Sequence, residues 1–473
     1  MGKVVAFFVL LGLLSTFAAA QEIENLSVSE DAHVVIISID GFPAHALWDN
    51  QIPLPFIRSL ARDGVWAEGL IPSVPSVTWS NHTTLVTGVP PAMHSLVYNG
   101  WLEWEDCTLP VRINPRRDKD ELVRVPTLYD IAHKLGLTTA EVNWPATRNS
   151  STLHDSFPDT PDNVRFMSDD LRWEIVEKGI LDDFTTHALW QHSRLGRDVV
   201  WKETAKHIIE TRSPNLLLIH LLNVDGMHHR YGVSTDPGYK AMSLADYHVR
   251  GIFESLEKAG ILDQTTLFIV SDHGFINTPK TFLPNVLLRE AGLLTVERGE
   301  IVEARAQAVS LGGTAMIYLD DPDDYKLKDK VKSLFSNREE ISNILTPDQF
   351  NGLGLAHPSE SDQIGNLMLA AEPGFGIANR ADLSDYLVDS AEHGFHLGNH
   401  GFLTDHQEMN ALFVAYGRGI KPGNRLGLIS NLSIAPTAAH LLGFEMEYSV
   451  GDVLDSILDL NFIRTSKGAI NDQ

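Results

Sequence analysis

Three aspartates and three histidines in this sequence have the chemistry and spacing of metal ligands. Asp225 and His229 are four residues apart just after an apolar run, so one helical turn would aim both at a single point. Asp272 and His273 are adjacent and can bind one ion together or two ions separately. A mixed nitrogen and oxygen set favours zinc, with manganese, cobalt or iron as possible substitutes. The six candidates are Asp40, Asp225, His229, Asp272, His273 and His400.

A hydroxyl nucleophile is available at Thr78, where a segment rich in Pro, Ser and Thr leads into a helical pattern. The position predicts that Thr78 is an N-cap, which is the common role of threonine at a helix start. The same helix end would offer free N–H groups and a positive dipole to an anion. Because a threonine hydroxyl is a poor nucleophile until it is deprotonated, a metal is needed as well. Two metals with a nucleophile indicate phosphoryl or sulfuryl transfer.

The elements that must position these residues form an α/β pattern. Short continuous apolar runs are typical of strands buried on both faces, and amphipathic segments lie between them. This alternation predicts a mostly parallel central sheet flanked by helices, with ligands bound at the carboxyl ends of its strands. Asp40, Asp225 and Asp272 each follow such a run and should share that edge. The predicted strands are 34–39, 216–222, 266–270 and 411–415, and the predicted helices 55–63, 127–135, 197–211, 243–259 and 435–442.

Residues 280–395 interrupt this rhythm with Gly- and Pro-bearing stretches and a charged segment. We interpret them as a cap subdomain, with a helix over 328–345, inserted into a catalytic domain of residues 32–445. Residues 446–473 would form a C-terminal tail. A separately folding C-terminal domain is the alternative.

The N-terminus has the pattern of a cleaved signal peptide over residues 1–20. Lys3 precedes an apolar run, and three alanines end at Ala20, near the expected cleavage point. The run is shorter than the roughly 20 residues that span a bilayer. A secreted or periplasmic protein without stable membrane insertion is therefore predicted. An uncleaved anchor is the alternative.

The amino-acid composition limits the kinds of molecule that this protein can be expected to bind. The 473 residues are 43% hydrophobic and 21% charged, which is typical of a globular protein. The net charge of −25 disfavours binding of long nucleic acids, because those surfaces need clustered Lys and Arg. A small anionic substrate held by metals stays compatible with this charge, and the sequence says nothing of the oligomeric state. The single Cys107 permits no internal disulfide.

Taken in order, the motifs resemble the nucleotide pyrophosphatase/phosphodiesterase family of the alkaline phosphatase superfamily. The resemblance implies two zinc ions per chain, one held by Asp40, Thr78, Asp272 and His273 and the other by Asp225, His229 and His400. It also implies that Thr78 is the covalent nucleophile in hydrolysis of small phosphodiesters or nucleotides. Asn99 would join the Trp79 backbone N–H in binding a phosphoryl oxygen. The motifs are Ile39-Asp-Gly-Phe42, Pro75-Ser-Val-Thr-Trp-Ser-Asn-His82, His94-Ser-Leu-Val-Tyr-Asn99, Asp225-Gly-Met-His-His229, Ser271-Asp-His-Gly274 and Asn399-His-Gly401.

Departures from the family pattern leave the substrate open. Trp79 and Ser80 stand where the family usually has Phe-Pro, and the Trp79 side chain could stack on a base or aryl group or pack in the wall. A phosphomonoesterase is one alternative, with Arg148 as its candidate cationic side chain, and a phosphonoacetate-type hydrolase is another. A non-catalytic secreted binding protein is the alternative from another class, although all seven expected ligand positions are filled.

Overall fold

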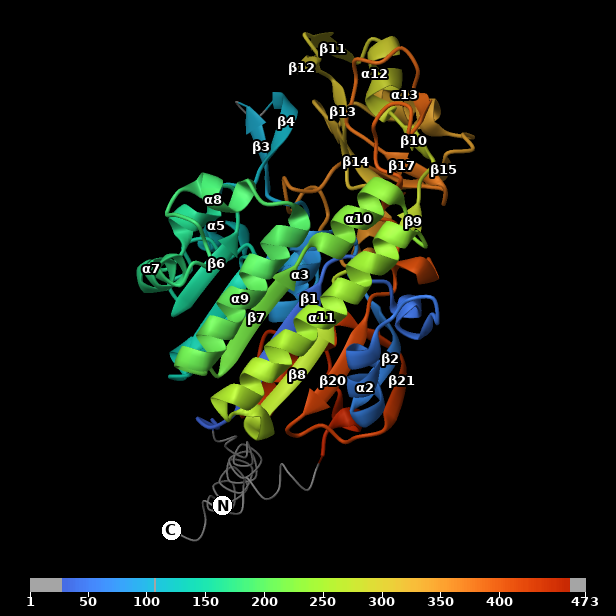
Figure 1. Cartoon of the computed structure of the whole chain (residues 1–473). Helices are drawn as coiled ribbons and strands as arrows, with labels where there is room; N and C mark the ends of the chain where they lie inside the picture. The colour runs from blue at the N-terminus through green and yellow to red at the C-terminus, as the bar shows by residue number, and fades with distance from the viewer. Residues whose placement is uncertain (1–27, 106–107, 460–473) are drawn as a thin grey trace, which may run out of the picture.

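The computed structural model describes residues 28–105 and 108–459. An eight-stranded sheet in the order β21-β2-β20-β8-β1-β7-β5-β6 forms its centre (Figure 1). All neighbouring strands are parallel except β20, which runs antiparallel to β2 and β8. The predicted mostly parallel α/β fold is confirmed. The strands are β1 (His33–Ile39), β2 (Val65–Ile71), β5 (Thr139–Pro145), β6 (Asp155–Asp159), β7 (Leu216–Leu221), β8 (Thr265–Val270), β20 (Phe413–Gly417) and β21 (Asn424–Ser430).

Helices cover both faces of the sheet, which explains the continuous apolar runs. In β1, Val35 and Ile37 face one core and Val34 and Ile36 face the other, and all four are buried. One core includes α2 (Pro55–Asp63), α9 (Arg194–Arg212) and α11 (Asp236–Ala259), and Figure 1 shows α9 and α11 across this face. The other includes α3 (Thr78–Thr87), α6 (Leu128–Lys134) and α15 (Ile434–Leu442).

Three central strands bring the predicted aspartates to one edge. β1 is paired in parallel with β7 on one side and β8 on the other, so the chain leaves all three strands at the same end. Asp40 follows β1 directly, and Asp272 comes two residues after β8 ends. Asp225 lies in the first turn of α10 (Asn223–Tyr231), and its N–H donates to the Asp40 carbonyl at 3.1 Å. The ligand-bearing turns are thus tied to each other through the backbone.

Smaller sheets lie beyond this edge (Figure 1). Three of them occupy residues 280–389, inside the range predicted for the cap, whose limits as a unit stay a prediction. A separate hairpin, β3 (Trp101–Glu105) with β4 (Thr108–Asn114), projects toward them. The strands of the three sheets are β10 (Lys280–Phe282), β11 (Leu294–Glu297), β12 (Glu300–Ala304), β13 (Ala306–Ser310), β14 (Thr314–Leu319), β15 (Ile341–Leu345), β16 (Leu367–Ala371), β17 (Phe375–Ile377) and β18 (Leu387–Asp389).

The helix predicted over 328–345 is wrong in its second half. Helix α13 (Tyr325–Phe335) ends before Asn337, whose φ of 61° cannot continue a right-handed helix. The chain then enters β15, which pairs with β16. The remaining α-helices and strands are short: α4 (Pro91–His94), α5 (Lys119–Leu122), α7 (Asp169–Glu177), α8 (Thr186–Trp190), α12 (Pro284–Glu290), α14 (Pro347–Phe350), β9 (Ile276–Asn277) and β19 (Gly398–Asn399).

The predicted signal peptide, residues 1–20, and residues 460–473 of the predicted tail lie outside the described residues, as does Cys107. Within the described ranges, no helix has both the length and the apolar character needed to cross a membrane.

A buried carboxyl in β5 gives the fold a testable pH dependence. Burial raises the pKa of Glu141 to about 7, although the Ser156 hydroxyl and the Trp144 N–H donate to its oxygens. The folded state therefore keeps a proton that the unfolded state releases near pH 4.5. This stabilising contribution is complete below that pH and is lost as the pH rises through about 7.

We expect Glu141→Gln to remove that part of the slope, on the order of 1 kcal/mol per pH unit. A glutamine can accept from Trp144 and donate to the Ser156 hydroxyl, so the local packing is kept. Urea unfolding of variant and wild type at several pH values between these limits measures the difference. Glu177→Gln, at an exposed position, is the matched control. Parallel pH profiles for Glu141→Gln and wild type would contradict the prediction.

Candidate active site

Each of the three aspartates at the sheet edge has one oxygen in polar contact with a neighbouring protein group and a second oxygen without a hydrogen-bond partner in the described part of the chain. His220 Nε2 lies 3.1 Å from Asp40 Oδ2, and Arg194 Nη1 lies 3.4 Å from Asp225 Oδ2. The N–H groups of Gly41 and His273 each donate to Asp272 Oδ1 at 3.1 Å. The opposite oxygens, Asp40 Oδ1, Asp225 Oδ1 and Asp272 Oδ2, are buried and have no hydrogen-bond partner among the described residues.

The three imidazoles are oriented in the same manner. His229 Nδ1 is 2.9 Å from the Gly398 carbonyl, His400 Nδ1 is 3.0 Å from the Ser76 carbonyl, and His273 Nδ1 is 3.1 Å from the Gly274 carbonyl. A carbonyl only accepts, so Nδ1 carries the hydrogen in each ring and Nε2 is left with a lone pair. This is the usual orientation of a metal-binding histidine.

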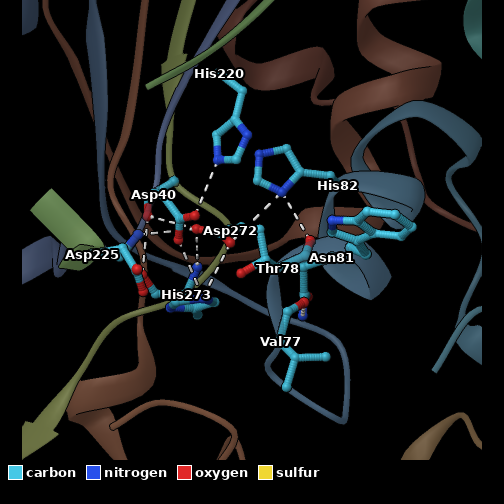
Figure 2. Close-up of polar contacts among 12 residues, drawn as sticks. Asp40, Val77, Thr78, Asn81, His82, His220, Asp225, Asp272 and His273 are labelled. Atoms are coloured by element: carbon cyan, nitrogen blue, oxygen red, sulfur yellow. Dashed lines mark hydrogen bonds and ion pairs between the residues drawn. The ribbon is translucent and has the colours of Figure 1, made fainter. Parts of the chain in front are cut away.

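The free oxygens and Nε2 atoms converge in two groups. One contains Asp225, His229 and His400, with His229 Nε2 at 3.1 Å and His400 Nε2 at 3.9 Å from Asp225 Oδ1. The other contains Asp40, Asp225 and His273. Asp272 Oδ2 adjoins it, 3.1 Å from His273 Nε2, and Figure 2 shows Asp40, Asp225, Asp272 and His273 side by side. The six predicted ligand side chains are therefore brought together.

The electrostatics of the cluster call for cations. Burial, together with the charge of Asp272, raises the pKa of Asp40 well above its usual range, and burial raises the pKa of Asp272 to about 6. Burial also lowers the pKa of His273 to about 3, which keeps its nitrogen available as a ligand. The orphaned oxygens, the neutral imidazole of His273 and the repulsion among the carboxylates all fit bound divalent metals.

Thr78 starts helix α3 beside this cluster, but it is not the N-cap. Val77 is the N-cap, with φ −120° and ψ 154°, and Thr78 is the first helical residue. The predicted capping role is wrong because the threonine comes one residue too late to cap its own N–H groups. Its hydroxyl has no hydrogen bond to any group that the structure describes, and its side chain is 7% exposed. The His82 side chain links Thr78 to the carboxylate cluster. Its Nδ1 is 2.8 Å from the Thr78 carbonyl and 3.6 Å from Asp272 Oδ2 (Figure 2).

Asn99 and Trp79 interact directly. The Trp79 N–H donates to Asn99 Oδ1 at 3.0 Å, which identifies the amide orientation because an N–H only donates. The Asn99 nitrogen is left to donate elsewhere, and the residue is exposed in the cavity described below. The Trp79 side chain is 6% exposed and its Nε1 donates to Asp159 Oδ2 at 3.0 Å. This burial suits wall packing rather than stacking on a substrate.

A cavity of about 450 Å³ opens between the sheet edge and the smaller sheets. His229, His400 and Asn99 line one side of it, together with Val77 next to Thr78. Thr281, Ser310, Asn379, Phe395 and His396 contribute from the 280–396 region, and Ile113 comes from the β3–β4 hairpin. None of the described residues that line it is Lys, Arg, Asp or Glu.

Helix α9 supports the second ligand group from outside. The carboxylate of Asp198 accepts the N–H groups of Leu222 at 2.9 Å and Asn223 at 3.1 Å, where α10 begins. One turn earlier, Arg194 reaches Asp225. Arg148, by contrast, pairs with Asp118 at 2.8 Å and lies over the Phe166 ring, so it is not at the site. Arg194 takes the place that the sequence analysis gave to Arg148.

The model of the type I phosphodiesterase/nucleotide pyrophosphatase family matches residues 34–403. The chain belongs to this family. It is accordingly a hydrolase of the phosphodiesterase and nucleotide pyrophosphatase class, a metal-dependent group in the alkaline phosphatase superfamily, as the motifs predicted.

Relatives span most of the chain at low identity. An uncharacterised pyrophosphatase/phosphodiesterase of Schizosaccharomyces pombe is 25% identical over 421 residues, covering 86% of this chain and 76% of its own. A bis(5′-adenosyl)-triphosphatase of Xenopus laevis is 22% identical over 426 residues, covering 89% and 80%. The murine ectonucleotide pyrophosphatase/phosphodiesterase 5, solved as an inactive threonine-to-alanine variant with AMP, superposes with a TM-score of 0.67 at 18% identity, over 90% of this chain and 100% of that one. This likeness supports the fold.

The sequence analysis missed the residues that hold the carboxylates. His220 had a signal, since it is a lone histidine inside a buried apolar strand, where an unpaired imidazole is costly. Asp198 and Arg194 had none, because both belong to an amphipathic helix in which charged residues are ordinary. Their role depends on where α9 begins relative to α10.

We expect His220→Leu to weaken zinc binding by about 10- to 100-fold, because Asp40 Oδ2 would lose the polar group that contacts it at 3.1 Å. His220→Gln keeps an amide donor at this position and should retain most of the affinity. Competition titration against a chromophoric chelator measures both variants without using activity. Zinc affinity of His220→Leu equal to that of wild type would show that Asp40 is held by other contacts.

Proposed function

We propose that this chain is a secreted zinc-dependent phosphodiesterase and nucleotide pyrophosphatase that works through a phosphothreonine intermediate. One observation carries the proposal. In each of the three aspartates one carboxylate oxygen contacts a protein group and the other has no hydrogen-bond partner among the described residues, and the Thr78 hydroxyl beside them has none either. Asp40, Thr78, Asp272 and His273 would hold one zinc and Asp225, His229 and His400 the other. When bound, the ions would supply Lewis acidity and positive charge to the phosphoryl group and to the reacting oxygens.

The side chains of this protein supply the nucleophile and orient the phosphoryl group. Thr78 Oγ1 attacks phosphorus in line, and the bond between phosphorus and the leaving oxygen breaks with its electron pair on that oxygen. The Thr78 hydroxyl proton passes to solvent. Asn99, held by the Trp79 N–H, offers its amide hydrogens to a non-bridging oxygen. In the second half, a water oxygen bonds to phosphorus, and the bond between phosphorus and Thr78 Oγ1 breaks with its electron pair on Oγ1. A proton from that water restores the Thr78 hydroxyl, and the phosphorylated product leaves.

The shape and charge of the cavity support a small substrate. Its size accepts a nucleotide-like group rather than a long polymer, and its uncharged lining leaves recognition of charge to the metal groups. Relatives named for bis(5′-adenosyl) triphosphate hydrolysis or solved with AMP favour nucleotides as substrates. The apolar segment before Ala20, and the similarity to a rat protein named ectonucleotide pyrophosphatase/phosphodiesterase family member 7, favour secretion.

Turnover of paired chromogenic esters tests the proposal. The zinc-supplemented chain should prefer bis-p-nitrophenyl phosphate and thymidine 5′-p-nitrophenyl phosphate to p-nitrophenyl phosphate. A chelator should abolish the activity and zinc should restore it. Preference for the monoester would move the function to a phosphatase with the same nucleophile, and zinc binding without turnover would favour a binding protein.

We expect Thr78→Ala to abolish turnover while largely preserving zinc, because the hydroxyl contributes the nucleophile and only one of seven ligands. Asp225→Asn should instead lower zinc retention, because it removes a charged oxygen that faces both ligand groups. Zinc content by elemental analysis, measured beside turnover on the diester, separates the two effects. High activity in Thr78→Ala would assign the nucleophile elsewhere.

Asn99→Ala should lower kcat by a factor on the order of one hundred, as expected for loss of one oxyanion donor. Asn99→Asp provides the matched comparison, since it can still accept from the Trp79 N–H but offers no amide hydrogens. We expect it to be at least as impaired. An unchanged kcat in Asn99→Ala would remove Asn99 from the site.

A further inference from the structure

Arg194 places a positive charge at the edge of the site. It is the first residue of α9, and its Nη1 lies 3.4 Å from Asp225 Oδ2. The side chain is 44% exposed, and Asp225 is its one ion-pair partner among the described residues. The guanidinium is therefore tied to the ligand cluster on one side and open to solvent on the other, with hydrogens still available to a ligand.

Gly226 provides the room for this arrangement. A Cβ added at Gly226 would lie 2.2 Å from Arg194 Nη1 and 2.4 Å from Arg194 Cδ. Gly226 is inside helix α10, where alanine is intrinsically favoured over glycine. Helix α10 thus has a residue of low helix propensity at the one place where Arg194 crosses it. The close packing limits where the guanidinium can go.

The rest of the site lacks such a charge. The cavity that His229 and His400 line has no Lys or Arg among its described residues. In the described part of the chain, Arg194 is also the one Lys or Arg within ion-pair distance of Asp40, Asp225 or Asp272. For a substrate bound next to Asp225, His229 and His400, Arg194 is therefore the nearest permanent side-chain cation.

We propose that Arg194 is a specificity-determining residue that favours substrates whose leaving group carries its own negative charge, such as phosphoanhydrides, over esters with an uncharged leaving group. The inference rests on the proposed function. In-line attack by Thr78 would expel the leaving group on the side of phosphorus away from Thr78 Oγ1, against the group formed by Asp225, His229 and His400, which Arg194 adjoins through Asp225. When a phosphoanhydride is cleaved, the bridging oxygen keeps the electron pair, and the guanidinium offsets the added charge.

Two thymidine nucleotides test this charge preference. Thymidine 5′-triphosphate and thymidine 5′-p-nitrophenyl phosphate transfer the same thymidylate group and differ in whether pyrophosphate or p-nitrophenolate leaves. In the zinc-supplemented full chain, Arg194→Gln removes the charge but keeps an amide donor for Asp225, and Arg194→Lys keeps the charge. Gly226→Ala displaces the guanidinium without removing it.

We expect the ratio of kcat/KM for the triphosphate to that for the nitrophenyl ester to fall about tenfold in Arg194→Gln. The ratio should fall in the same direction in Gly226→Ala and change by less than about threefold in Arg194→Lys. Taking the ratio cancels any loss that comes only from a misplaced Asp225. An equal loss on both substrates, or an unchanged ratio, would overturn the inference.

Affinities measured without turnover separate this inference from the proposed function. In the Thr78→Ala background, calorimetry should show that Arg194→Gln weakens binding of the triphosphate about tenfold and of the nitrophenyl ester much less. Equal weakening, or no binding of either nucleotide, would overturn the role of Arg194. If the wild-type chain hydrolyses neither substrate, the proposed function fails, while these affinities still decide the assignment of Arg194.

Discussion

Repulsion among three buried carboxylates is the constraint on which the rest of the site depends. Asp40, Asp225 and Asp272 end in a small volume shielded from water, where like charges interact strongly. The fold places a polar group against one oxygen of each: a strand histidine, a helix arginine, or backbone N–H groups of the adjoining turns. The remaining oxygens are aimed inward, where divalent cations would offset the repulsion.

This constraint explains why the supporting elements are central ones. His220 belongs to β7, and its other ring nitrogen meets the Asn143 carbonyl on β5 at 3.0 Å. Three adjacent parallel strands therefore set the position of Asp40 before any ligand is bound. On the other side, α9 supplies Asp198 for the start of α10 and Arg194 for Asp225. A shift of α9 would move both the helix and the carboxylate that it carries.

The sequence predicted the fold correctly where a short run of neighbouring residues determines the element. Runs such as 216–222 are apolar without alternation because helices cover both faces, and the aspartates that follow them show where the strands end. The predictions failed where an element boundary had to be placed to within one residue, or where the result depends on packing between residues that are distant in the sequence. Thr78 is one position past the cap, and the helix predicted over 328–345 ends at Phe335, where Ser336 is extended and Asn337 is left-handed. The sequence gives no reason to place Arg194 rather than Arg148 at the site, and only the position of α9 in the fold distinguishes them.

The ligands also come from distant parts of the chain, and this has a consequence for biosynthesis. His400 is oriented by the carbonyl of Ser76, 324 residues earlier, so this contact forms only after nearly the whole catalytic region has been made. Such long-range closure is slow and comes late in folding. A partly synthesised or misassembled chain would therefore present an incomplete set of the proposed ligands. Metal capture would act as a checkpoint that stabilises only finished molecules, because a ligand that binds the native state alone shifts the equilibrium toward it.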